Sequence, residues 1–319
     1  MELSEIKMID RREIISNTNY LELIHLIKKG FQESTIIVPH RHHYSINMRA
    51  EDQHDTILSM PVWEDNRDLG IKFITVHPDN PTNDLPTVQG VFILTDAQNG
   101  KVVSILDASA LTVKPTAATS ALASSLLSRQ DSKCLLMIGT GALSTELIQA
   151  HRAVRPIKKV YVWGRNEAKA RQVCDTIDDI DCVVCDLDEH VIGEADIIST
   201  ATMSFDPLFH GSYVSEGTHI DLVGSYKKNM REVDDDVIRR SKIFVDTAAA
   251  SLQSGDLVIP MSNGVIQKED IIGDLFDLCQ SKVEGRHSDI EITLFKSVGY
   301  ALEDLIAARY YYNKTKNGS

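Results

Sequence analysis

Three small residues, Gly139, Gly141 and Ser144, occupy the spacing Gly-x-Gly-x-x-small. An apolar run over residues 134–138 comes directly before them; a helical pattern and a second apolar run, residues 160–163, follow. This order of strand, glycine turn, helix and strand is typical of the first half of a dinucleotide-binding unit. Gly139 would permit the tight turn, and Gly141 would let the backbone approach a pyrophosphate at the helix N-terminus. The alternative is a glycine turn in another kind of α/β unit.

The end of the second apolar run indicates which dinucleotide such a unit would hold. Sites that prefer NAD place Asp or Glu here, about 20 residues past the glycines, to bind the ribose 2′-hydroxyl. This chain has Gly164, Arg165 and Asn166 instead. Because a guanidinium pairs with a phosphate, Arg165 favours NADPH, with NADH as the alternative. In the simpler interpretation, Arg165 is a solvated side chain ahead of a helix that Asn166 caps.

Composition and charge exclude several classes of function. The chain has 319 residues, of which 43% are hydrophobic and 25% charged, with a formal net charge of −13. Such a composition is ordinary for a protein of two domains, and the negative charge argues against nucleic acid as a partner. No run approaches the roughly 18 apolar residues of a membrane span, and the first residues lack a signal-peptide core. We therefore expect a cytoplasmic protein.

The cysteines and histidines do not predict a metal or redox site. Five cysteines at irregular spacing do not suggest a disulfide framework. Cys182 and Cys185 fall on a β-rich run, where positions three apart point to opposite faces. His40, His42 and His43 have no carboxylate at ligand spacing. We expect no metal.

The first third of the chain predicts a helix followed by β-strands. Apolar residues recur at helical spacing between Leu21 and Phe31. Strands are expected over residues 44–48, 56–62, 70–76, 90–95 and 102–106, with a hairpin turn at Asn99-Gly100. An Ala/Ser/Leu-rich stretch, residues 116–127, predicts a connecting helix.

A strand–helix alternation then runs to about residue 285. Later strands are expected over residues 195–200, 219–224 and 242–246, and a long helical pattern covers 292–312. The fold class predicted is α/β, a Rossmann-type doubly wound parallel sheet plus a β-rich α+β domain. The expected domains are 1–115, completed by a C-terminal helix over 292–319, for substrate binding and dimerisation, and 116–291 for NAD(P).

Ligands of open α/β sheets lie at the carboxyl ends of the strands. Thr200, Thr202, Val223 and Ser225 follow expected strands and are candidate cofactor contacts; ordinary turn chemistry is the alternative for each. Ser297, expected at the start of the last helix, is a further candidate, with packing as its alternative.

Motifs along nearly the whole chain resemble the ornithine cyclodeaminase/μ-crystallin family. Each motif is modest alone, and their order and spacing make the match specific. They are Pro39-x-Arg41, Gly70-x-Lys72, Leu111-Thr112, Thr116-Ala117-Ala118, Gly139-Thr140-Gly141-Ala142, Gly224-Ser225-Tyr226, Arg231-Glu232, Phe295-Lys296-Ser297-Val298-Gly299 and Glu303-Asp304. The resemblance implies a homodimer with a β-rich substrate domain, a Rossmann domain and a small amino or imino acid substrate.

Two positions depart from the family pattern. Tyr226 stands where the cyclodeaminases carry a catalytic aspartate, and Pro115 replaces an arginine that usually precedes Thr116. Proline has neither charge nor an N–H donor, so Lys114 is the nearest replacement cation. Without the aspartate, the multistep cyclisation of ornithine is less expected than one hydride transfer to a cyclic C=N bond.

The sequence is therefore closest to family members that are Δ1-pyrroline-2-carboxylate reductases, also called ketimine reductases. The expected reaction is NAD(P)H-dependent reduction of Δ1-pyrroline-2-carboxylate, or of its six-membered analogue, Δ1-piperideine-2-carboxylate, to L-proline or L-pipecolate. Ornithine cyclodeaminase and alanine dehydrogenase are the enzymatic alternatives. A third alternative is an NADPH-dependent small-ligand binding protein similar to μ-crystallin.

Candidate roles follow from this chemistry. Arg41 would clamp the substrate carboxylate, unless it is a surface arginine of a basic cluster. Lys72 lies in an apolar strand, where a charge needs a reason, and would bind the carboxylate or donate the proton. Ser225 is a second candidate catalytic residue, and Lys114 a third substrate contact. The candidate cofactor contacts are Thr116, Gly139, Gly141, Ala142, Ser144, Gly164, Arg165, Asn166, Thr200, Thr202, Val223, Ser225 and Ser297.

Overall fold

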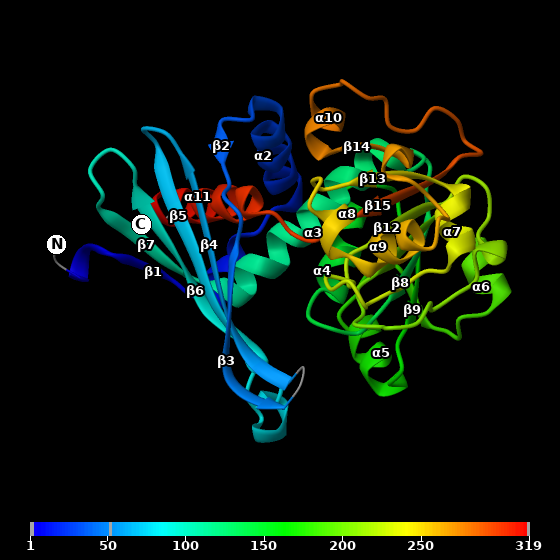
Figure 1. Cartoon of the computed structure of the whole chain (residues 1–319), viewed down its shortest axis with the longest axis horizontal. Helices are drawn as coiled ribbons and strands as arrows, with labels where there is room; N and C mark the ends of the chain where they lie inside the picture. Colours follow the sequence, from blue (N-terminus) through cyan, green and yellow to red (C-terminus); the bar gives the residue numbers. More distant parts are fainter. Residues whose placement is uncertain (1–2, 51–52, 318–319) are drawn as a thin grey trace. The chain divides into compact units, whose positions relative to one another are not determined.

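The computed structural model describes residues 3–50 and 53–317 and divides the chain into two compact units (Figure 1). The first unit runs to Thr116 and resumes at Tyr300; the second is Ala117–Gly299. Within the described residues, no helix is both long and apolar enough to cross a membrane.

The first unit is a mixed sheet with helices packed on it. The sheet order is β1-β7-β6-β5-β4-β2, with β3 also paired to β4; β1 and β7 run parallel and the other pairs antiparallel. The strands are β1 (Lys7–Ile9), β2 (Ile36–Ile37), β3 (His42–Ala50), β4 (Gln53–Glu64), β5 (Asp68–Val76), β6 (Val88–Asp96) and β7 (Val102–Asp107). The helices are α1 (Arg11–Asn17), α2 (Tyr20–Glu33), α11 (Ala301–Asn317) and the first part of α3 (Ala108–Leu127), with short 3-10 helices at Leu3–Glu5 and Asn80–Asn83.

The alternation of side chains along β5 decides which face of this sheet is covered. Gly70, Lys72 and Ile74 are buried, whereas Leu69 and Phe73, on the other face of the strand, are exposed. α11, red in Figure 1, packs on β4, β5 and β6 and against α2. The five strands and the turn at Asn99-Gly100 that the sequence predicts are confirmed: Gly100 has a φ of 75° and connects β6 to β7.

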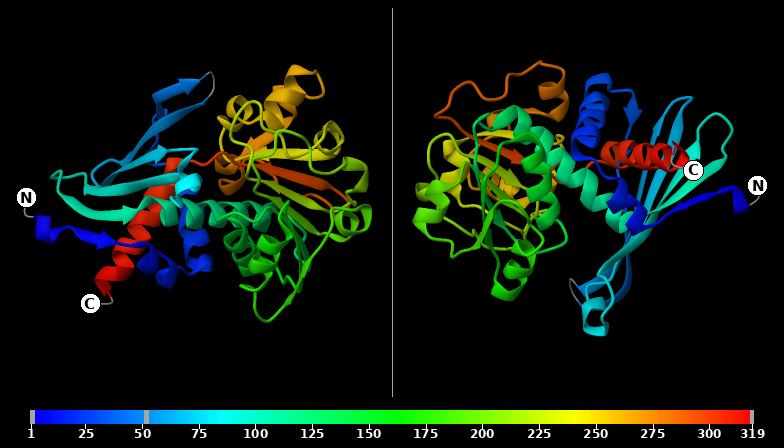
Figure 2. Two further views of the ribbon diagram at one scale, coloured as in Figure 1. Left: turned by 90° about the horizontal axis from the view of Figure 1, so that it is seen from below. Right: turned by 180° about the vertical axis from the view of Figure 1, so that it is seen from behind.

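The second unit is a doubly wound parallel sheet, as predicted. Its order is β10-β9-β8-β11-β12-β15-β13-β14, with every pair parallel and helices on both faces (Figure 2). The strands are β8 (Cys134–Ile138), β9 (Lys159–Trp163), β10 (Asp181–Val184), β11 (Ile197–Thr200), β12 (His219–Leu222), β13 (Ser241–Val245), β14 (Ile271–Asp274) and β15 (Ile292–Lys296). The α-helices are α4 (Ser144–Val154), α5 (Glu167–Cys174), α6 (Glu189–Glu194), α7 (Asp235–Arg240), α8 (Ala250–Gln253), α9 (Gly255–Ser262) and α10 (Leu275–Cys279), and 3-10 turns lie at Gly211–Tyr213 and Lys268–Asp270.

Residues 292–296 correct the sequence prediction of one helix over 292–319. They form β15, which lies between β12 and β13 and is buried at all five positions. A short apolar run fits a central strand and a buried helix equally well, so periodicity alone could not decide. Ser297 and Gly299 follow the strand instead of starting the helix, which begins at Ala301. The segment up to Gly299 belongs to the second unit.

The helix expected over 116–127 is longer than predicted. α3 begins at Ala108, where the Asp107 carboxylate accepts a hydrogen bond from Ala110 N, and it contains Pro115. Proline in a helix interior removes one backbone hydrogen bond. For this reason the sequence predicted that the helix begins only at Thr116. Burial of α3 along most of its length outweighs that loss.

A buried histidine on β12 links folding to pH. His219 is fully buried; its Nδ1 lies 3.0 Å from Thr293 Oγ1, and its Nε2 has no hydrogen-bond partner in the described structure. Burial lowers the pKa of His219 to about 3, with the Asp221 carboxylate acting in the opposite direction. His219 is therefore protonated below about pH 6.5 in the unfolded chain, but only below about pH 3 in the folded chain.

Acid should accordingly destabilise the protein through His219. Between pH 7.5 and pH 5 this group alone lowers the free energy of unfolding by about 2 kcal/mol. His219→Asn, which keeps a polar atom near Thr293, should lose that part of the pH dependence. Urea unfolding of both proteins at the two pH values measures the difference; equal pH slopes would contradict the assignment.

Candidate active site

The glycine turn after β8 has the shape that a pyrophosphate requires. Gly139 has a φ of 126°, and a β-carbon there would lie 2.7 Å from the Ala201 carbonyl oxygen. Ser144 closes the turn by donating from Oγ to Gly139 O (2.9 Å) and from N to Gly141 O (3.1 Å). A β-carbon at Gly141 would meet nothing within 4 Å, and Ala142 is exposed.

The start of α4 completes this cradle. The N-cap residue Leu143 makes no side-chain hydrogen bond to the helix. N–H groups at a helix N-terminus attract an anion through their partial positive charge. The turn and the uncapped helix start therefore fit the phosphates of a dinucleotide.

The end of β9 lies against the same turn. A β-carbon at Gly164 would approach Thr140 Cγ2 to 2.5 Å, so glycine allows this contact. Arg165 is exposed and forms no ion pair with any described residue. The Asn166 side chain caps α5 by accepting from Lys169 N at 3.1 Å, so its structural role is established, whatever it contributes to ligand binding.

Hydrogen bonds across the carboxyl edge of the sheet bring the other candidate cofactor contacts into one row. Ala201 N donates to Ile138 O, Val223 N to Thr200 O, and Ser297 N to Leu222 O, at 2.9, 2.9 and 3.1 Å. Thr200 is buried, and its hydroxyl has no hydrogen-bond partner among the described residues. The turn after β8 and the residues after β11, β12 and β15 thus follow one another along one edge.

Ser225 is at this edge but its hydroxyl points inward. The side chain is fully buried; Oγ donates to Met230 O at 2.7 Å and lies 3.0 Å from Ser254 Oγ. A catalytic role for this hydroxyl would require it to leave both partners. That role stays a prediction.

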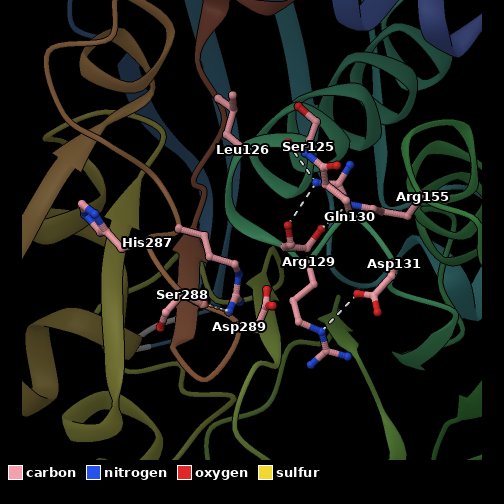
Figure 3. A pocket seen from close by; sticks show the side chains of 11 residues that line it. Ser125, Leu126, Arg129, Gln130, Asp131, Arg155, His287, Ser288 and Asp289 are labelled. Atoms are coloured by element: carbon pink, nitrogen blue, oxygen red, sulfur yellow. Dashed lines mark hydrogen bonds and ion pairs between the residues drawn. The ribbon is translucent and has the colours of Figure 1, made fainter.

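A cavity of about 610 Å³ in the second unit lies at the opposite edge of the sheet (Figure 3). Its lining comes from the C-terminus of α3 and from segments that precede strands, including Arg129, Arg155 and Asp289. Arg155 donates to the carbonyls of Ser124, Ser125 and Ser128. Arg286 also donates to Leu127 O, so Arg155 and Arg286 cap the carbonyl end of α3, whereas Arg129 pairs with Asp196.

Lys72, in the first unit, is a buried charge with a partner. Its Nζ lies 2.6 Å from Asp304 Oδ2 on α11 and 3.5 Å from Thr112 Oγ1 on α3. Burial raises the pKa of Asp304, and the neighbouring ammonium opposes that rise. The ion pair with Asp304 compensates the charge of Lys72 and so explains how this side chain can be buried within an apolar strand.

Arg41 lies between β2 and β3, where the pairing with β4 shifts by one residue. Ile37 pairs with Trp63 and His42 with Ser59, so five steps along this segment match four steps along β4. A one-residue shift turns a side chain to the other face of a sheet, so strand register leaves both faces open for Arg41. Lys72, which pairs with Met60, is on the covered face, and the role of Arg41 stays a prediction.

Lys114 and Thr116 lie on different faces of α3. The Lys114 ammonium lies over the Tyr20 ring, 5.4 Å from its centroid. Since residues two apart on a helix do not face each other, Lys114 lies on a different face of α3 from Thr112. Thr116 Oγ1 donates to Thr112 O at 2.8 Å.

Two acidic residues, Asp304 and Glu232, were not predicted as site residues. Asp304 pairs with Lys72, and Glu232 binds the loops after β11 and β12. The sequence did contain one signal for such residues: an acidic side chain within an apolar stretch, such as residues 301–311, needs a buried partner. Within the described residues, no three His, Cys, Asp or Glu side chains converge as a metal site.

Comparisons with known proteins agree along the whole chain. The family model described as ornithine cyclodeaminase/mu-crystallin matches residues 5–319. A Δ1-pyrroline-2-carboxylate reductase of Colwellia psychrerythraea is 38% identical over 319 residues, 97% of this chain and 99% of that protein. The structure of Thermococcus litoralis Δ1-pyrroline-2-carboxylate reductase with NADH and L-proline has a TM-score of 0.91 at 30% identity, covering 98% of both chains.

A second enzyme class has almost the same fold. An archaeal alanine dehydrogenase dimer with bound NAD has a TM-score of 0.90 at 26% identity, covering 98% of this chain and 97% of the other. The match to the family model and the identity to the Colwellia protein extend over both units. The chain belongs to the ornithine cyclodeaminase/mu-crystallin family.

Proposed function

We propose that this protein is an NAD(P)H-dependent reductase of cyclic imino acids, which converts Δ1-pyrroline-2-carboxylate to L-proline. The observation that carries the proposal is similarity, over nearly the full length, to reductases of this substrate. The glycine turn after β8 supports the nucleotide half, because its open cradle fits a pyrophosphate. Δ1-Piperideine-2-carboxylate, one methylene larger, is the second substrate proposed.

The reaction makes modest demands on the protein. A bound nicotinamide would supply the hydride for the imine carbon. The chain itself must hold the substrate carboxylate, keep the imine protonated and exclude water. Such a site needs cations and one proton donor, which agrees with the absence of a carboxylate at Tyr226.

We propose that Lys72 and Arg41 provide these functions. Lys72 would donate the proton or bind the carboxylate, held in place by Asp304. Arg41 would bind the carboxylate as a bidentate clamp. Lys114 would have to leave the Tyr20 ring to take part, so it ranks behind both. Ser225 ranks behind Lys72 as a catalytic residue because its hydroxyl is engaged at two partners.

We propose NADPH as the preferred cofactor, with NADH as the alternative. Arg165 follows the strand end that contacts the glycine turn, and no described residue neutralises it. An unpaired guanidinium at that position is free to bind a 2′-phosphate.

The first unit also supports a homodimer. Phe73 on β5 and Val91 on β6 are a directly opposed pair, 42% and 37% exposed, and Leu69 on the same face is 39% exposed. An apolar face of this kind normally meets a partner, and we propose a second copy of the chain. A mass in solution equal to one chain would refute it. The cytoplasmic location expected from the sequence remains a prediction.

The proposed activity is tested by a substrate panel with NADPH and NADH. Oxidation of the reduced cofactor is expected with Δ1-pyrroline-2-carboxylate, and the product should be L-proline. Ornithine with NAD and pyruvate with ammonia are the comparison reactions; the archaeal alanine dehydrogenase makes the second one necessary. Ammonia release from ornithine would reverse the assignment. So would turnover of pyruvate with ammonia in the absence of turnover of Δ1-pyrroline-2-carboxylate. Ligand binding without any turnover would favour a binding protein.

Replacing Lys72 tests the proton donor. Lys72→Met should lower kcat by about a hundredfold or more. Because the change leaves Asp304 buried without its cation, the double variant Lys72→Met/Asp304→Asn should recover stability but not activity. Lys101→Met, at an exposed lysine paired with Glu5, is the matched control. Wild-type kcat in the double variant would remove Lys72 from the mechanism.

Replacing Arg165 tests the cofactor. Arg165→Ala should raise the KM for NADPH by about tenfold or more and leave the KM for NADH within about twofold, since only NADPH carries the 2′-phosphate. Arg171→Ala, at an exposed arginine on α5 that pairs with Glu167, is the control. Equal losses for both cofactors would argue against a phosphate contact.

A further inference from the structure

One buried carboxylate joins two loops at the carboxyl edge of the parallel sheet. Glu232 is fully buried; its Oε1 accepts hydrogen bonds from Thr202 N at 2.7 Å and Thr202 Oγ1 at 2.8 Å. Its Oε2 accepts from Gly224 N at 2.9 Å and Ser225 N at 3.2 Å. Thr202 follows β11 and the other two donors follow β12, so one side chain crosslinks both loops.

Two further buried charged residues, Asp256 and Lys296, support Glu232. Glu232 N donates to Asp256 Oδ1 at 2.7 Å, and Asp256 Oδ2 lies 3.4 Å from Lys296 Nζ on β15. Lys296 also donates to Leu222 O at 3.1 Å, at the end of β12. Burial and the neighbouring Asp256 raise the pKa of Glu232; Lys296 and the Thr202 donors oppose that rise. Four donors aimed at two oxygens are what a buried carboxylate needs.

The two loops are in contact at Gly224. A β-carbon there would collide with the backbone of Thr202 and lie 2.6 Å from Glu232 Oε1. The glycine therefore permits the approach, and the carboxylate fixes it. A small change at either position would separate the loops.

The strand order indicates which part of a dinucleotide these loops serve. In a doubly wound sheet, the half that begins with the glycine turn holds the adenosine, and the half beyond the switch point holds the other nucleotide. Here β8, β9 and β10 form the first half, and β11 and β12 begin the second. The loops joined by Glu232 belong to the nicotinamide half.

We propose that Glu232 is a positioning residue for the nicotinamide end of the cofactor. It acts through Thr202, Gly224 and Ser225, whose backbone it holds in one arrangement, and it does not touch the reacting atoms. The inference rests on the proposed function, because it assumes a dinucleotide along this edge.

The test separates the two halves of the cofactor. Glu232→Gln keeps the size of the side chain but presents an NH2 group to N–H donors, so part of the clamp is lost. The dissociation constant for NADH should rise by about tenfold or more, while that for ADP-ribose, which lacks the nicotinamide, should stay within about twofold. Glu291→Gln is the matched control: that carboxylate accepts from Lys242 Nζ and His287 N and precedes β15, at the opposite edge.

If Glu232 had a purely structural role, Glu232→Gln would raise the dissociation constants for NADH and ADP-ribose equally, or would change neither of them. Either result overturns the proposal. Wild-type protein that binds neither NADPH nor NADH would instead refute the proposed function. Because Glu232→Gln could fail to fold, Glu232→Asp is the second variant, which retains the charge but shortens the reach. Amide hydrogen exchange in the protein without ligand should then accelerate about tenfold or more at Thr202, Gly224 and Ser225 and remain unchanged within β11 and β12. Unaltered exchange at the three loop amides would overturn the proposal.

Discussion

The turn after β8 exists in this form because residue 139 has no side chain. A φ of 126° is strained for other residues, and a β-carbon would press on the Ala201 carbonyl. The contact joins the neighbouring strands β8 and β11 at the point where the strand order reverses. The start of α4, the end of β9 and the loop after β11 all take their positions from this turn. The dinucleotide site that we propose at the carboxyl edge depends on it.

Buried charges mark the positions that packing alone does not explain. In the first unit, the Lys72–Asp304 pair lies on the covered face of the sheet; in the second, Glu232, Asp256 and Lys296 lie beneath the carboxyl edge. Each buried charge costs free energy unless donors and counter-charges surround it, and an apolar replacement often stabilises a fold as well. Their presence on elements that carry the predicted site is therefore easier to understand as positioning than as stability.

Local patterns predicted the elements whose contacts are local. The glycine turn, the hairpin at Asn99-Gly100 and the alternating strand β5 all have their signals within a few residues. β15 was missed because its place between β12 and β13 is decided by strands distant in the sequence. The beginning of α3 was missed because burial overrides the proline at position 115. The partners of Lys72 and of the strand-end loops are also distant in sequence, so Asp304 and Glu232 became visible only in three dimensions.

The central claim is that a reduced pyridine nucleotide lies across the turn after β8. A crystal structure of the protein with NADPH and L-proline tests it most directly. The account predicts the pyrophosphate at Gly141 and the N-terminus of α4, with the nicotinamide beside the loops after β11 and β12. Electron density for the nucleotide at the Arg129–Arg155 cavity, or a turn filled by protein side chains with no nucleotide bound, would contradict it.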